Sequence, residues 1–169
     1  MTSSPIGRLF PTADGADLVV NRTFRAPIED VWASVTESDR TARWFGAWQG
    51  DAAPGATIKV QMAFEEQSPW FDFRIDACEP PRRLAVSMID QSSNQRLELL
   101  LSHADGRTEL RLVHHLDNPA EAGDMGPGWE YYLDMLVAAR DGLPTPDFGD
   151  YYPAMKPYYE GLLTQTDPA

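Results

Sequence analysis

The sequence predicts an α+β fold in which a curved, antiparallel six-stranded sheet wraps around one long C-terminal helix. Three observations predict it: a first strand followed by two short helical segments, five alternating segments between residues 58 and 114, and a long amphipathic segment at residues 125–143. Strands joined by short turns pair antiparallel, and a sheet with one apolar face needs a cover. The expected order is one strand, two helices, five strands and a helix.

The first strand is expected at residues 18–25, where apolar side chains alternate with mostly polar ones. Arg22 falls on the apolar side of this strand and breaks the pattern. Residues 1–16 show no sustained periodicity and are expected to form a poorly ordered or loosely docked lead-in. We therefore expect order to begin at about residue 17.

Two short helices follow the first strand. Pro27 suits the first turn of a helix, and apolar residues recur at helical spacing over residues 28–36. Ser38 is expected to be the N-cap of a second helix that runs to Trp44 and ends at Gly46.

The next five segments alternate with the period of half-buried strands. Turns are expected at residues 80–81 and 91–94, and the Asp-Gly pair in residues 104–107 is the strongest hairpin signal. The segments run from Ile58 to Phe64, Phe71 to Ala77, Leu84 to Met88, Leu97 to Leu101 and Leu110 to His114.

The cover for the sheet is the predicted helix at residues 125–143, which Gly142 stops. Glu130 and Asp134 lie one residue off its apolar stripe and are expected to contact solvent or the C-terminal tail. We expect a single domain over residues 1–143 and a Pro-rich and aromatic extension over residues 144–169, docked on the domain or on a partner. The stripe consists of Trp129, Tyr132, Leu133, Leu136 and Arg140.

The composition bounds the function. The 169 residues carry a formal net charge of −12, which argues against nucleic acid or anionic lipid as partners, because a phosphate backbone recruits clustered Lys and Arg. The single cysteine, Cys78, cannot form an internal disulfide, and the first residues lack the pattern of a secretory signal, so we expect a cytoplasmic protein. No apolar run is long enough to predict a membrane helix.

The sequence also resembles a known family, the SRPBCC superfamily of helix-grip domains, which includes START and birch-pollen-allergen-like proteins. The branch it is most similar to contains homologues of the activator of the ninety-kilodalton heat-shock-protein ATPase. The resemblance implies a ligand cavity between sheet and helix, or a chaperone-associated role in the stress response. It rests on RTFRAP at 22–27, VW at 31–32, TARWF at 41–45, EPPRRL at 79–84, DGRTEL at 105–110 and GW at 128–129.

The inward-facing residues of the predicted sheet and helix are the candidate ligand-binding residues. Either they line a mostly apolar cavity or they pack as a solid core. Polar members are the most informative, because burying a polar group without a partner costs about 1 to 3 kcal/mol. The candidates are Arg22, Phe24, Trp44, Met62, Phe64, Phe71, Phe73, Val86, Met88, Leu99, Leu112, His114, Trp129, Tyr132, Leu133 and Leu136.

Two of these candidates have alternative interpretations. Arg22 either anchors a ligand anion or pairs with an Asp or Glu to hold the sheet or a helix end. His114 either acts as a base or ligand donor or is a satisfied core histidine. The sequence holds no nucleophile elbow, phosphate loop or dinucleotide fingerprint, and we predict no metal site and no cofactor.

The sequence therefore favours a noncatalytic protein that binds a small hydrophobic or aromatic molecule. A cyclase- or hydrolase-like enzyme that uses polar residues of the same cavity is the first alternative. A chaperone-associated interaction module is the second, and the aromatic extension could also reach across to a second copy in a homodimer.

Overall fold

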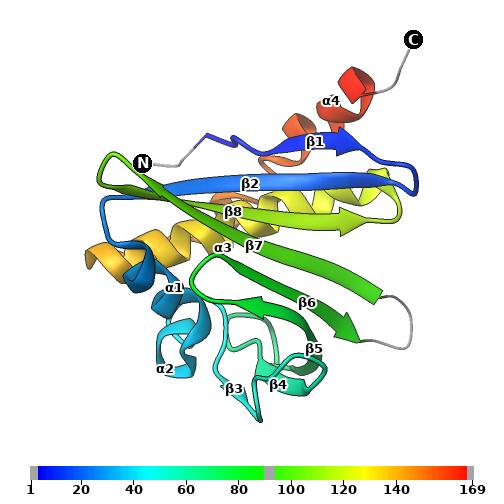
Figure 1. The fold of residues 1–169 in the computed structure, drawn as a ribbon. Coiled ribbons are helices and arrows are strands. Elements are labelled where there is room, and N and C mark those ends of the chain that lie inside the picture. Colours follow the sequence, from blue (N-terminus) through cyan, green and yellow to red (C-terminus); the bar gives the residue numbers. More distant parts are fainter. Residues whose placement is uncertain (1–3, 90–93, 167–169) are drawn as a thin grey trace.

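The computed structural model describes residues 4–89 and 94–166 and shows one long helix lying against a twisted antiparallel sheet (Figure 1). The predicted turn at residues 91–94 falls almost entirely outside the described residues. In chain order the elements are β1 (Arg8–Pro11), β2 (Ala16–Phe24), α1 (Ile28–Thr36), α2 (Ser38–Thr41), β3 (Trp48–Gln49), β4 (Thr57–Gln61), β5 (Trp70–Glu79), β6 (Arg83–Ile89), β7 (Asn94–Ala104), β8 (Arg107–Leu116), η1 (Pro119–Glu121), α3 (Ala122–Asp141), η2 (Phe148–Asp150) and α4 (Lys156–Thr166).

The sheet has eight strands in the order β1-β2-β8-β7-β6-β5-β4-β3, so the predicted count of six was wrong. The additional strands, β1 and β3, lie at the two edges and span only four and two residues. Segments this short are too brief to show an alternating pattern. The lead-in, which was expected to be poorly ordered or loosely docked, contains β1, which pairs antiparallel with β2.

The first helix spans the predicted residues, but the second is shorter than expected. It ends at Thr41, and the chain then continues through turns. Ser38 does not cap it with its side chain. Instead, the Ser38 hydroxyl accepts a hydrogen bond from the Trp48 backbone N–H at 2.8 Å and donates to the Trp48 carbonyl at 2.9 Å. This double contact closes residues 38–48 into a loop over the sheet.

The hairpin and the helix stop follow the predicted local chemistry. Asp105 and Gly106 both adopt positive φ, of 54° and 75°, as the tight turn between β7 and β8 requires. Gly142 lies in the left-handed region with φ of 66° and caps α3.

The interior divides into two hydrophobic cores. The filled core lies between α3, α1 and the β1-β2-β8 part of the sheet, and it includes Leu18, Leu110 and Leu133, which have essentially no solvent exposure. The hollow core lies at the β4-β5-β6 end and is built on Ile58, Val60, Met62, Phe73 and Ile75. Figure 1 shows α3 running along the first region, with α2 beside the second.

The C-terminal extension folds back over its own chain. Helix α4 packs against α3 and β1, and Tyr151, Met155 and Tyr159 are buried in the filled core. Gly126 on α3 makes room for the Tyr159 ring, because a Cβ at that position would lie 2.5 Å from ring carbons.

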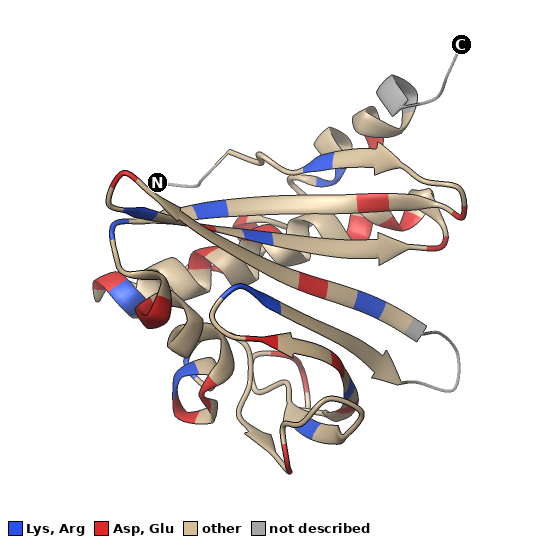
Figure 2. Cartoon of the chain, in the orientation of Figure 1, with Lys and Arg blue, Asp and Glu red and all other residues tan. Residues whose placement is uncertain are grey.

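Charged residues are distributed over strands and helices. Lys and Arg are interspersed with Asp and Glu along β2, β7 and β8 rather than gathered on one of these strands (Figure 2). On the face of the sheet away from α3, His115 lies between the Asp17 and Glu98 carboxylates, at 2.7 and 3.0 Å, and Glu98 also pairs with Arg83.

Candidate functional site

An apolar cavity of about 130 Å³ lies in the hollow core. Its floor is the inner face of β4 to β8, and its roof is the end of α1 with residues 41–48. Helix α3 contributes only Trp129, so the cavity does not lie between the sheet and the long helix as predicted. The lining residues are Val35, Thr36, Thr41, Trp44, Phe45, Gly46, Trp48, Ala52, Ile58, Val60, Phe73, Ile75, Cys78, Leu84, Val86, Leu97, Leu99, Leu112 and Trp129.

The cavity exists because its roof is shorter than the cover over the rest of the sheet. Val86, Leu97 and Leu99 face the interior, yet each is only partly buried, because the roof leaves space above them. The space is accessible from outside, since Thr36 and Ala52 at its rim are partly or fully exposed.

The indole N–H groups in the roof are already satisfied by the protein. Trp44 donates to the Ser34 carbonyl at 2.9 Å, and Trp48 donates to the Thr36 carbonyl at 2.8 Å. Both acceptors belong to the last turns of α1. These two rings therefore present carbon surface, and no spare donor, to the cavity.

The two threonines of the lining are satisfied in the same way. The Thr36 hydroxyl donates to the Trp32 carbonyl and the Thr41 hydroxyl to the Gly46 carbonyl, each at 2.7 Å. The other polar side chain of the lining is the Cys78 thiol, and burial raises its pKa. A neutral thiol is only a weak hydrogen-bond donor.

The third indole is held from below by His114. Trp129 donates its N–H to Nδ1 of His114 at 3.0 Å, so the proton of the neutral imidazole resides on Nε2. The histidine is 1% exposed. Burial, assisted by the nearby charge of His115, lowers the pKa of His114 to about 4. His114 is therefore neutral at physiological pH and can keep accepting this bond.

Aromatic rings close the end of the cavity next to α3. Phe45 stacks on Trp129 with centroids 6.0 Å apart and planes 16° apart, and it meets the edges of Phe73 and Tyr132 at 6.2 and 5.3 Å. The Tyr132 hydroxyl donates to Glu65 at 2.8 Å, which links α3 to the loop between β4 and β5. Rigid ring contacts thus define this wall.

The structure brings six of the sixteen predicted ligand-binding residues together around the cavity. They come from the roof, from four strands and from α3. They are Trp44, Phe73, Val86, Leu99, Leu112 and Trp129.

The other ten lie elsewhere. Phe24, Leu133 and Leu136 pack in the filled core, Met62 is buried in the hollow core without lining the cavity, and Phe71, Met88 and Tyr132 pack partly buried around it. His114 lies behind Trp129, and Arg22 is ion-paired outside the cavity. Phe64 is 40% exposed, because β4 ends at Gln61 and the predicted alternation stops there.

Sequence reasoning missed much of the roof and the contribution of Cys78 at the end of β5. A register shift between Ile75 and Ala77 changes which side chains face inward, so that Cys78 lines the cavity although the alternation of this strand placed Ala77 on the inward side. Phe45 and Trp48 were not named because the roof has no periodic pattern. The density of aromatic residues between 44 and 48 was the signal that could have found them.

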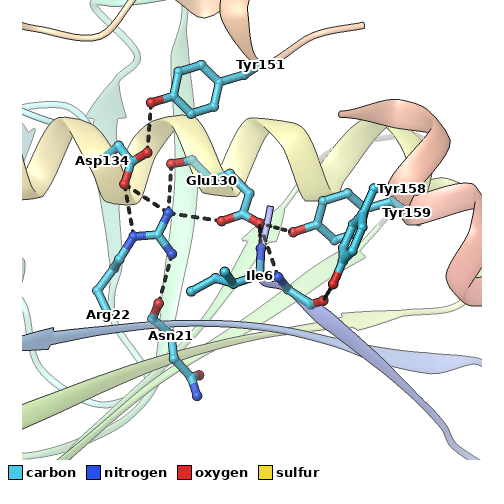
Figure 3. Close-up of polar contacts among 9 residues, drawn as sticks. Ile6, Asn21, Arg22, Glu130, Asp134, Tyr151, Tyr158 and Tyr159 are labelled. Carbon is cyan, nitrogen blue, oxygen red and sulfur yellow. Dashed lines mark hydrogen bonds and ion pairs between the residues drawn. The ribbon is translucent and has the colours of Figure 1, made fainter. Parts of the chain in front are cut away.

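Arg22 pairs with two carboxylates of α3 (Figure 3), which is the second of the two interpretations that the sequence left open. Its Nη2 lies 2.9 Å from the Glu130 carboxylate and its Nε 3.0 Å from Asp134. The extension completes the cluster, since Tyr159 donates to Glu130 at 2.6 Å and Tyr151 to Asp134 at 2.7 Å. Glu130 and Asp134 thus do contact the tail, but Glu130 is 1% exposed and does not reach solvent.

The same carboxylate holds the N-terminal segment. The backbone N–H groups of Ile6 and Gly7 donate to Oε2 of Glu130 at 2.7 and 3.1 Å, and Tyr158 donates to the Gly7 carbonyl at 2.9 Å (Figure 3). Glu130 therefore joins β2, the N-terminal segment and α4 at one buried point.

A second, polar hollow lies on the other side of Trp44, between α1, α2 and the end of α3. Arg140 donates to the Asp30 carboxylate and to the Ser34 hydroxyl, each at 2.7 Å. The hydrogen bond from Arg140 holds the pKa of Asp30 below its ordinary value. These charges face away from the apolar cavity, since neither Arg140 nor Asp30 lines it.

Two further features bear on what the site can bind. Across residues 4–89 and 94–166, no three His, Cys, Asp or Glu side chains gather in a way that could hold a metal ion. None of the helices in this described part is long and apolar enough to cross a membrane.

Comparison with known proteins places the chain in a family. The model of the Activator of Hsp90 ATPase homolog 1-like proteins matches residues 25–140. The chain belongs to this family. The match runs from just after β2 almost to the end of α3, so β1, β2 and α4 lie outside it. No curated protein sequence matches the chain.

Several solved structures share this Hsp90-activator-like fold. The crystal structure of CalU16 from Micromonospora echinospora has 25% identity and a TM-score of 0.76, and the match covers 96% of this chain and 99% of CalU16. A protein from Bordetella parapertussis has 24% identity and a TM-score of 0.72 over 94% of this chain and 92% of its own. DynU16, a protein in the dynemicin biosynthetic locus, has 23% identity and a TM-score of 0.68 over 78% of this chain and 50% of its own.

Proposed function

We propose that the protein binds a small hydrophobic or aromatic molecule in the apolar cavity of the hollow core. The observation that carries this proposal is the cavity itself. In the filled core of the same chain apolar side chains pack with little or no exposure, whereas the hollow core keeps about 130 Å³ of unfilled, apolar space. Folded interiors are normally packed to crystal-like density, and apolar pockets with access from outside are the usual form of ligand sites.

The residues around the cavity favour binding over catalysis. A catalyst of the cyclase or hydrolase kind would need a polar group facing its substrate. His114 and Arg22, the polar pair predicted for that role, are engaged by Trp129 and by Glu130 and lie outside the cavity lining.

A matched pair of variants on one strand tests the proposal. Leu99 lines the cavity, and its neighbour Leu100 points to the opposite face of the sheet. Saturation-transfer NMR with a panel of small hydrophobic compounds should detect binding to the wild type and to Leu100→Trp. Leu99→Trp fills the cavity and should abolish it. A panel without any binder, or binding that survives Leu99→Trp, would exclude this function for the cavity.

A further inference from the structure

We propose that the cavity selects uncharged aromatic molecules of about one ring, and that His114 enforces this selectivity by engaging the N–H of Trp129. This inference rests on the proposed function and narrows the ligand class. Two observations support it: the volume of the cavity, and the hydrogen bonds that already satisfy the strong side-chain donors of its lining.

The volume sets the number of rings. An engineered cavity of about 150 Å³ lined by Leu, Ile and Phe in another protein stays dry and binds benzene. The present cavity has about 130 Å³ and a lining of the same apolar kind. One six-membered ring fits this space, whereas a second fused ring needs more volume than the cavity offers, so its walls would have to move.

The polar side chains of the lining disfavour a charged ligand. The side-chain N–H and O–H groups of Trp44, Trp48, Thr36 and Thr41 are all bonded to backbone carbonyls of the roof. A carboxylate or ammonium on the ligand would therefore lose its water and gain no partner, which costs several kcal/mol. A single hydroxyl would lose less, because it could still meet the weak Cys78 thiol or water at the rim.

His114, which lies outside the cavity lining, accepts the remaining indole N–H, that of Trp129. Without an acceptor on the floor, the Trp129 N–H would be the one strong donor of the lining with no protein partner. Nδ1 of His114 takes up that donor and fixes the ring against Phe45. His114 is thus a positioning residue, because it acts on a ligand only through the indole.

A panel of four compounds tests the ligand class by NMR titration. Toluene should bind most tightly, phenol roughly tenfold more weakly, naphthalene more weakly than toluene, and benzoate not measurably. Benzoate or naphthalene binding more tightly than toluene would overturn the inference while leaving the proposed function in place. Binding of none of them, nor of larger hydrophobic compounds, would remove the proposed function itself.

The role of His114 is tested by two substitutions and a control. His114→Leu should weaken toluene binding roughly tenfold and shift the Trp129 indole N–H resonance. His114→Gln supplies a side-chain oxygen as acceptor and should restore both. His103→Leu, at an exposed strand end, should change neither.

A double-mutant cycle keeps this test independent of overall stability. Trp129→Phe removes the donor, so adding His114→Leu in that background should no longer change toluene affinity. Unchanged affinity in His114→Leu, a failed rescue by glutamine, or an equal effect in both backgrounds would each overturn the assigned role.

Discussion

The filled core and the hollow core share one continuous sheet, yet the first is covered by two helices and buried ion pairs, whereas the second is covered by a short, irregular roof. In the filled core, polar groups from four parts of the chain satisfy one another around Glu130. In the hollow core, the hydroxyl and indole groups of Thr41, Trp44 and Trp48 are satisfied locally, by partners no more than 12 residues away along the chain. In the filled core, buried charged groups connect segments that are distant in the sequence. In the hollow core, hydrogen bonds between residues close in the sequence leave the cavity wall apolar.

The largest loss of stability should come from removing the Glu130 carboxylate, which connects the segments of the filled core. Glu130→Ala removes one of the two carboxylates that pair with Arg22 and leaves two backbone N–H groups and the Tyr159 hydroxyl without the acceptor they share. Loss of one partner of a buried pair costs about 3 to 5 kcal/mol. Urea unfolding should show this loss.

The control for that experiment is Glu29→Ala, an exposed acid on α1, which should change stability by less than about 0.5 kcal/mol. Similar effects of the two variants would mean that the buried cluster does not hold the chain ends.

The second effect concerns pH and the boundary between the two cores, where His114 supports Trp129. Because the folded pKa of His114 is about 4 and its ordinary value is 6.5, the unfolded chain takes up a proton first as pH falls. The free energy of unfolding should decrease between pH 6.5 and 4, by about 3 kcal/mol in total from this group.

The carboxylates contribute their own acid dependence, so the comparison is with His114→Gln. Unfolding measured from pH 7 to 4 should give a flatter curve for this variant. Parallel curves would show that His114 titrates alike in the folded and unfolded chains.

The third effect contrasts two glycines of α3. Gly126→Ala should destabilise by about 1 to 3 kcal/mol, since its Cβ would collide with the Tyr159 ring. Gly128→Ala meets nothing within 4 Å and should stabilise by up to about 1 kcal/mol through helix propensity. Thermal unfolding of both variants measures the difference, and equal shifts would contradict tight docking of the extension.

The smallest effect comes from adding volume to the hollow core. Val86→Leu places one more methylene group in the cavity and should stabilise by up to about 1 kcal/mol. The same substitution at Val20, which is fully buried in the filled core, should destabilise. Destabilisation by both would indicate that the cavity is occupied by neighbouring side chains in solution.

The sequence predicted the elements whose pattern is periodic or whose turn chemistry is specific. The first helix, the tight turn at Asp105 and Gly106, and the stop at Gly142 all follow from local rules. It did not predict β1 or β3, because pairing with a neighbouring strand, rather than their own pattern, forms these short edges.

The candidate site was predicted less well, because a cavity depends on which inward-facing side chains remain uncovered once the chain has packed. Inward parity identified Phe73 and Val86, but parity cannot tell which inward residues the roof leaves uncovered. The burial of Glu130 was not predicted, although the sequence had already placed its partner Arg22 on the inward side of a strand. Arg22 on the apolar side of its strand required a carboxylate, and Glu130 and Asp134 lie one helical turn apart on the only long helix of the prediction.

The contact between Glu130 and the two ends of the described chain also bears on how the protein comes to fold during synthesis. Gly7 is translated long before Tyr158, and the contact between them spans 151 positions. Contacts that distant form slowly, since a long loop must close first. The Ile6 and Gly7 amides gain their acceptor only after Glu130 has been made, and Tyr158 and Tyr159 close over that contact later still, so translation itself delays the final closure of this core.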